Sequence, residues 1–287
     1  MKSYVEFKDT MVRDIKGHLP EEYHDWQVNV TFIPKVNGFK EAVSISPSEG
    51  SCAVPNLYLN DFYDVYRANG NIEETLQEAA KLYLNGMEFA KGMVEDFFCE
   101  QKNENIVMNL INMESNRRLL SECPHRQMLD LSIIYKWIIE LPDGSFNSAI
   151  INNGAMASIG LSEEEIYNIA LENTKRLFPP NVVELDDNFI ILTNKRYVNG
   201  ATTMVYKEEL HKIAERFNSD LYILPSSIHE IIVIATGDWT LEKLYKIVSE
   251  ANHEVVKPED ILSESVYFYS LKSKELSLAD DSYSCVS

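Results

Sequence analysis

The stretch that decides the fold is FIILTNKRYVNGATTMVYKEELHKIAERFNSDLYILPSSIHEIIVIA, residues 189–235. It is the densest apolar segment of the chain. Runs of β-branched and aromatic residues, separated by Asn, Gly and Ser, predict strands joined by turns. The predicted strands span 189–192, 201–206, 220–224 and 228–234, and a helix is predicted over 207–217. So many elements in so short a stretch indicate a folding core.

Two further helices are predicted from their caps. Ser162 followed by Glu165 is a capping-box pattern and opens a helix over 163–177. Asn71 with Glu74 has the same spacing before the longest helix, whose apolar residues recur every three or four positions. Both helices are therefore expected to pack one face against a core.

Hairpins dominate the rest of the chain. Asn37-Gly38 between two alternating runs predicts one of them. Because strands and helices do not alternate regularly, the predicted fold class is α+β, with mostly antiparallel sheets and packed helices. A polar stretch near residue 102 is a candidate boundary between an N-terminal α+β region (1–102) and a C-terminal α+β core (103–276), and a single domain is the alternative. The Ser- and Asp-rich residues 277–287 are expected to form a frayed, flexible tail.

Composition excludes several classes of function. The 287 residues carry 45 acidic and 26 basic side chains, a net charge of −19, which argues against direct binding of nucleic acid or anionic membrane. No run approaches the roughly 18 consecutive apolar residues of a membrane span. The N-terminus has no apolar leader, and the four cysteines are scattered. We therefore expect a cytoplasmic protein with free thiols.

The most suggestive short motif lies inside the folding core. Ser226, Ser227, His229 and Glu230 bring together the residue types of a hydrolase site. Residues two apart on one face of a strand sit about 6 to 7 Å apart, whereas a nucleophile and its base must lie within about 3 Å. The favoured interpretation is a structural turn between two strands, and a catalytic site is the alternative.

Two charged groups are candidate binding residues. Asn194-Lys195-Arg196 is a basic island in an acidic chain, and its arginine could hold a phosphate or carboxylate with two hydrogen bonds. Internal ion pairing with the acidic surplus is the competing interpretation. Glu73, Glu74 and Glu78 lie on the solvated face of the long helix and are candidates for contact with a basic partner.

Metal and cofactor signatures are missing from the sequence. The six histidines form neither HExxH nor HxH, and no glycine-rich phosphate loop occurs. The sequence predicts no metal site and no cofactor.

Several segments together resemble a bacterial family known only as a domain of unknown function. The segments are Tyr58–Tyr63, Asn116–Leu120, Pro124-His125, Glu172–Thr174, Leu192–Lys195, Gly200-Ala201, Ser219–Glu230 and Val266–Tyr269. The resemblance covers nearly the whole chain and supplies no activity or catalytic residue. It implies an origin in anaerobic Gram-positive bacteria, and a setting in integrative conjugative elements.

Two functional hypotheses follow, and a structural subunit of a larger assembly is a third option that the sequence does not separate from the first. The first is a non-enzymatic, acidic protein that binds a protein partner with a basic surface. In a mobile-element setting its concrete form is an inhibitor of a nucleic-acid-binding host defence enzyme. The alternative is a hydrolase-like enzyme with its site near Ser226–Glu230 and a basic anchor at Lys195 and Arg196.

Overall fold

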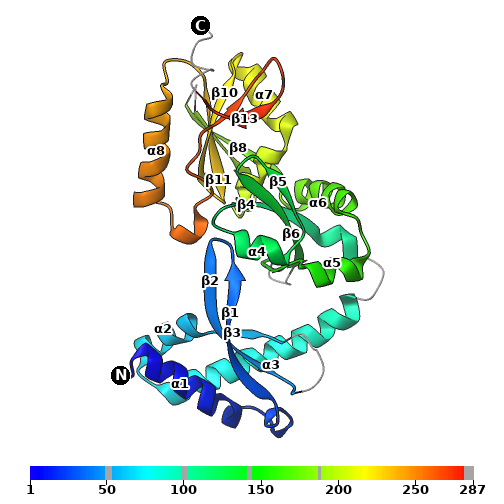
Figure 1. Cartoon of the computed structure of the whole chain (residues 1–287), viewed down its shortest axis with the longest axis vertical. Coiled ribbons are helices and arrows are strands. Elements are labelled where there is room, and N and C mark those ends of the chain that lie inside the picture. Colours follow the sequence, from blue (N-terminus) through cyan, green and yellow to red (C-terminus); the bar gives the residue numbers. More distant parts are fainter. Residues whose placement is uncertain (49–53, 98–101, 141–143, 187–188, 281–287) are drawn as a thin grey trace. The chain divides into compact units, whose positions relative to one another are not determined.

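Figure 1 shows a computed structural model that describes residues 1–48, 54–97, 102–140, 144–186 and 189–280. For residues 89–97, 102 and 226 it describes the backbone alone. The chain forms two compact units, Met1–Lys102 (unit 1) and Asn103–Ser287 (unit 2).

Unit 1 combines helices with one three-stranded sheet. Its elements are α1 (Tyr4–Asp14), η1 (Ile15–His18), η2 (Glu21–Tyr23), β1 (Gln27–Lys35), β2 (Gly38–Ser46), β3 (Asn56–Tyr58), α2 (Leu59–Asn69) and α3 (Ile72–Phe97). The strands are antiparallel in the order β1-β2-β3. The predicted hairpin is confirmed: Lys35 pairs with Gly38, and Asn37 adopts a left-handed φ of 59° in the loop between them.

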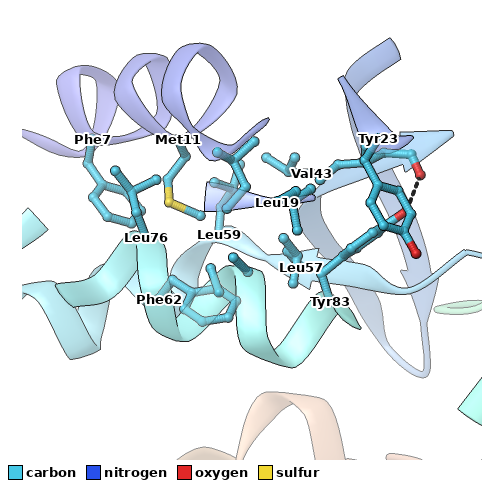
Figure 2. Packing of buried hydrophobic residues seen from close by; sticks show 14 of the residues in the cluster. Phe7, Met11, Leu19, Tyr23, Val43, Leu57, Leu59, Phe62, Leu76 and Tyr83 are labelled. Carbon is cyan, nitrogen blue, oxygen red and sulfur yellow. Dashed lines mark hydrogen bonds between the residues drawn. The ribbon is translucent and has the colours of Figure 1, made fainter. Parts of the chain in front are cut away.

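The core of unit 1 lies between α1, α3 and the sheet. Phe7 and Met11 of α1 and Leu76 of α3 belong to one cluster of buried side chains (Figure 2). Burying each such side chain contributes about 1.5 to 3 kcal/mol. Tyr83 of α3 is also buried, and its hydroxyl donates to the carbonyl of Ile45 at 2.8 Å. The apolar face that the residue spacing predicts therefore packs against the core, along the part of α3 whose side chains are described.

The described residues of unit 2 form two sheets. The first is built from β4 (Ile106–Asn112), β5 (His125–Met128), β6 (Leu131–Glu140) and β7 (Phe146–Ile150). The second is built from β8 (Pro180–Asp186), β9 (Phe189–Asn194), β10 (Leu221–Ser227), β11 (Glu230–Ala235), β12 (Tyr267–Tyr269) and β13 (Leu276–Leu278). The helices are η3 (Lys102–Asn105), which begins at the boundary, α4 (Arg117–Glu122), α5 (Asn153–Ile159), α6 (Glu163–Leu177), η4 (Gly200–Val205), α7 (Lys207–Phe217), α8 (Leu241–Glu254) and η5 (Pro258–Asp260).

The six-stranded sheet has the order β13-β12-β10-β11-β9-β8, and all its pairings are antiparallel. Leu244 and Val248 of α8 are buried in one cluster with Tyr222 and Phe268 of this sheet. In the smaller sheet, β6 is central: β4 pairs with it along one edge, and β5 and β7 pair with successive parts of it. The predicted α+β class with mostly antiparallel sheets is confirmed.

Helix α6 begins and ends where its caps predict. The side chain of Ser162 accepts from the backbone of Glu165, and the Glu165 carboxylate accepts from the Ser162 backbone at 2.9 Å. At α3 only half of the expected box forms. Asn71 accepts from the backbone of Glu74 at 3.2 Å, but its own N–H donates to Asn69.

One predicted strand of the folding core is wrong. Residues 201–205 lie in the 3₁₀ helix η4 (Gly200–Val205) instead of a strand, and Tyr206 caps the end of that helix. Strand β9 already has β8 on one edge and β11 on the other, so the sheet has no place for another strand beside it. The Thr203 hydroxyl donates to the carbonyl of Gly200 at 2.7 Å, which closes the helical turn.

Two further expectations change at the sheet edges. Strand β8 was not predicted, because Pro179-Pro180 reads as a helix end; an edge strand tolerates the proline at its start. The frayed tail was expected from Ser277, but Ser277 lies in β13 and pairs with Phe268. Residues 281–287 of that expected tail lie outside the described part of the chain. Among the described helices, none is long and apolar enough to span a bilayer.

Candidate functional site

The predicted basic island lies in the turn after β9, residues 194–200, hereafter the 194–200 turn. Asn194 is buried; its amide donates to the carbonyl of Val198 at 2.7 Å and its side-chain oxygen accepts from the backbone of Arg196 at 2.9 Å. Tyr197 and Asn199 both adopt left-handed φ values, 56° and 53°. The turn is therefore held from within by Asn194, and this residue's polar groups face the protein.

Gly200 brings the turn against the neighbouring strand connection. A Cβ atom at this position would lie 2.1 Å from the hydroxyl of Thr193 and 2.3 Å from the carbonyl of His229. The same hydroxyl donates to the same carbonyl at 2.7 Å. Only glycine allows this close approach, and the approach holds His229 beside the turn.

The imidazole of His229 is engaged through both nitrogens. Nδ1 accepts from the backbone N–H of Asn199 at 3.1 Å, and Nε2 lies 3.3 Å from a carboxylate oxygen of Asp260. A ring nitrogen that accepts a hydrogen bond carries no proton. In the neutral ring the hydrogen is therefore on Nε2, and this N–H group donates a hydrogen bond to Asp260. The side chains are 37% and 26% exposed. This pair is partly buried, and the turn fixes the orientation of the imidazole.

The serine of the motif does not meet this imidazole in the way a hydrolase requires. The hydroxyl oxygen of Ser227 accepts from the backbone N–H of His229 at 3.0 Å, as in a turn cap. Glu230 begins β11 and is paired with Ser227 in the ladder. The side chain of Ser226 lies outside the described residues. Since Nδ1 and Nε2 bind Asn199 and Asp260, neither is placed to deprotonate Ser227.

The charged members of the basic island differ in their surroundings. Arg196 forms an ion pair with Glu140 of β6, and its guanidinium lies 5.5 and 5.3 Å from the ring centres of Phe146 and Phe178. Its charge is thus matched inside unit 2. Lys195 is exposed, and its backbone N–H donates to the carbonyl of Pro179 at 2.9 Å.

A small cavity lies beside the turn. It is lined by Asn109, Lys136 and Asn199, among others, and has a volume of about 10 Å³. With the Asn109 oxygen turned toward Lys136, the amine donates to it at 3.0 Å, and the Asn199 side chain lies 3.0 Å from the same oxygen. A cavity of this size holds about one water molecule. It is too small for a metabolite.

The acidic candidates lie on α3. Glu73, Glu74 and Glu78 are exposed, whereas Leu76 and Ala79 on the other face are buried. Glu73 lies 3.8 Å from the ring of His18. These carboxylates face solvent and are available to a partner.

Comparison with known families assigns the chain. The model of a family of unknown function, DUF5688, matches residues 4–190 and 181–271. The chain belongs to the DUF5688 family. The expectation of an uncharacterised family is thereby confirmed, and it brings no activity with it. No curated protein and no solved structure matches the chain.

In this DUF5688 chain, sequence reasoning missed the partners of His229. Asp260 lies 31 positions away in sequence, and nothing in the residues around either side chain points to the other. It also missed Asp130, which accepts hydroxyl hydrogen bonds from Ser263, Ser265 and Tyr267 at 2.6, 3.0 and 2.7 Å. Burial is the main cause that raises the pKa of the Tyr267 hydroxyl, followed by the charge of Asp130. This cluster joins the residue before β6 to the start of β12 and to the segment that precedes it.

Metal binding has no support in the described ranges. There, no three His, Cys, Asp or Glu side chains lie close enough together to hold a metal ion. The chemical feature that is available to a ligand is the acidic surface. The polar side chains of the 194–200 turn that are described as bonded, Asn194 and Arg196, bind other parts of the same chain.

Proposed function

We propose that this DUF5688 protein acts by binding a protein partner that presents a basic surface. Its main support is the acidic surplus, which extends over both units. In unit 1, 10 basic minus 17 acidic residues gives −7, and in unit 2, 16 basic minus 28 acidic residues gives −12. A partner with a positive surface would be attracted to either unit, and most strongly at low salt.

The pairing of the basic residues supports the same proposal. Arg196 binds Glu140, Arg117 binds Glu114 at 2.5 Å, and Arg118 lies 3.9 Å from Glu122. Each of these three arginines is thus matched by a neighbouring carboxylate. The exposed glutamates of α3 add to a surface that favours cationic partners.

In its most specific form, the partner is a nucleic-acid-binding enzyme of a host defence system, and the protein inhibits it. An acidic surface that occupies a basic groove would compete directly with the phosphate backbone. The setting in a mobile element rests on the family resemblance alone. Location in the cytoplasm, where such an enzyme would work, is part of the proposal.

The hydrolase alternative receives no support from those of its side chains that the structure describes. It requires the hydroxyl of Ser227 to face a free imidazole nitrogen. The Ser227 hydroxyl instead bonds the backbone of His229.

The proposal is tested by affinity purification from a lysate of the native host, with and without nuclease, read by mass spectrometry. Three proteins are compared: the wild type, the charge reversal Glu73→Lys/Glu74→Lys/Glu78→Lys on α3, and a matched reversal on α8. The α8 control is Glu242→Lys/Glu250→Lys/Glu254→Lys, which changes three exposed carboxylates of another helix.

We expect a stoichiometric, nuclease-resistant partner that the wild type retains. Reversal on α3 should reduce its recovery at least about tenfold, and the α8 control should retain most of it, since charges directly at an interface contribute most. A partner recovered equally with all three proteins would show that the α3 carboxylates are not the contact surface. If nothing co-purifies, the proposal is wrong.

A further inference from the structure

Unit 2 has a groove of a size suited to a ligand at one end of its six-stranded sheet. Its volume is about 610 Å³, within the roughly 300 to 1,000 Å³ of small-ligand sites. It is bounded by the start of β10, the end of β11, the loop that leads into α8, and the β12–β13 hairpin. We call it the Trp239 groove.

Three aromatic rings line the groove. Tyr222 and Phe268 are cross-strand partners, and their rings meet edge to face with centres 5.8 Å apart. Both are almost fully buried, so they form the floor. Trp239 is half-buried and meets Phe189 edge to face at 5.7 Å. Because each ring is held by a neighbouring ring, the aromatic surface is rigid before any ligand arrives.

Carboxylates form the rim. Asp238 and Glu275 are exposed, and Asp220 is fixed at the entrance because one of its oxygens accepts from the backbone of Leu271 at 2.7 Å. Among the described residues that line the groove, Lys272 is the one basic side chain. Three carboxylates against one amine leave the groove negatively charged.

We infer that the Trp239 groove receives a lysine or arginine side chain of the basic partner. Aromatic faces attract a cation placed over them, and nearby carboxylates add direct ion pairing. The long apolar stem of such a side chain would lie along the buried rings while its charged end reaches the rim. This inference rests on the proposed function, because it names the groups of the partner that the acidic surface binds.

The test uses short peptides as probes, so it needs no knowledge of the partner. The probes are acetyl-Gly-Arg-Gly-amide and acetyl-Gly-Lys-Gly-amide, with acetyl-Gly-Gln-Gly-amide as the neutral control. Each is titrated into the full chain at low salt, and the indole N–H resonance of Trp239, assigned with a Trp239→Phe variant, is followed by NMR.

Two charge variants separate the groove from general electrostatics. Asp238→Asn/Glu275→Gln removes two rim charges, and Glu73→Gln/Glu74→Gln removes two charges from α3 as the matched control. We expect both cationic probes to shift the Trp239 resonance saturably. The rim variant should weaken this binding about fivefold, while the α3 variant leaves it unchanged.

Equal binding of the neutral peptide, equal weakening by both variants, or no shift of Trp239 would each overturn the inference. The same rim variant also serves in the capture experiment. If the wild type and the rim variant capture the partner equally, the groove does not bind it. The inference about the groove would then be wrong, while the proposed function would still stand. Loss of that partner with the rim variant, together with its retention by the α8 control, would support the groove.

Discussion

The 194–200 turn and the Trp239 groove both gather polar and charged side chains in unit 2, but they use them differently. In the turn, Asn194 and Arg196 bond to other parts of the same chain. At the groove, the carboxylates of Asp238 and Glu275 are exposed above a floor of buried rings. The difference indicates that the turn serves the fold, whereas the groove is the place where we propose that a partner binds.

The largest effect is expected from Gly200→Ala. The added methyl group would overlap the Thr193 hydroxyl and the His229 carbonyl, and overpacking of this severity costs about 3 kcal/mol or more. The free energy of unfolding in urea measures it. Gly237→Ala is the control, since nothing lies within 4 Å of its Cβ position. Equal stability of the two variants would refute the tight contact.

Asn194→Ala should cost about 2 kcal/mol. It removes the bonds to Val198 and to the Arg196 backbone, and leaves buried polar groups without those partners. The neighbouring Lys195→Ala changes an exposed side chain and should stay within about 0.5 kcal/mol of the wild type. If the two urea midpoints coincide, Asn194 does not hold the turn.

The contribution of Glu41 in unit 1 to the free energy of unfolding should depend on pH, because its carboxylate accepts hydrogen bonds in the folded protein. The hydrogen bond from Tyr4, at 2.7 Å, and then Lys8, at 2.9 Å, hold the pKa of Glu41 below its usual range. A lowered folded-state pKa means that the stabilisation is present above the unfolded pKa of about 4.3 and is lost as the pH falls through the folded value.

Glu41→Gln is therefore expected to lower the free energy of unfolding by about 1 kcal/mol at pH 7. Its difference from the wild type should shrink as the pH falls below about 4. Tyr4→Phe should flatten the same part of the pH profile. Urea unfolding between pH 3 and 7 measures both variants, and a difference that stays constant over this range would contradict the assignment.

The smallest effect on stability is expected at the groove itself. Asp238→Asn/Glu275→Gln should change the free energy of unfolding by no more than about 0.5 kcal/mol, because both carboxylates are exposed. Paired with the peptide titration, this result would separate binding from folding. A decrease of about 2 kcal/mol in the free energy of unfolding would show that these residues stabilise the fold, as those of the 194–200 turn do.

Local patterns in the sequence predicted much of the fold. The capping box at Ser162 and the Asn37-Gly38 hairpin are encoded within a few residues, and the structure has both. Residues 201–206 have strand propensity, but both edges of the preceding strand β9 are occupied by β8 and β11, and edge occupancy depends on the whole fold. Local propensity cannot contain that information.

The candidate site was less predictable for the same reason. The contact of His229 with Asp260 joins residues 31 positions apart, and the groove brings Tyr222 together with Phe268 across two strands. Sequence proximity drew attention to Ser227 and His229, whose hydrogen bonds turn out to close a strand connection. The charge surplus, which needs no geometry, could be read directly from the composition.

The central claim is that the acidic surface, and not the imidazole beside the 194–200 turn, carries the function. Its most direct test is capture of the partner by the wild type, by His229→Gln, and by the α3 reversal Glu73→Lys/Glu74→Lys/Glu78→Lys, quantified side by side. Glutamine removes the imidazole while keeping an oxygen that can accept from Asn199. The account predicts that His229→Gln recovers the partner as the wild type does and that the α3 reversal loses it. Loss of the partner with His229→Gln, together with full recovery by the α3 reversal, would contradict it.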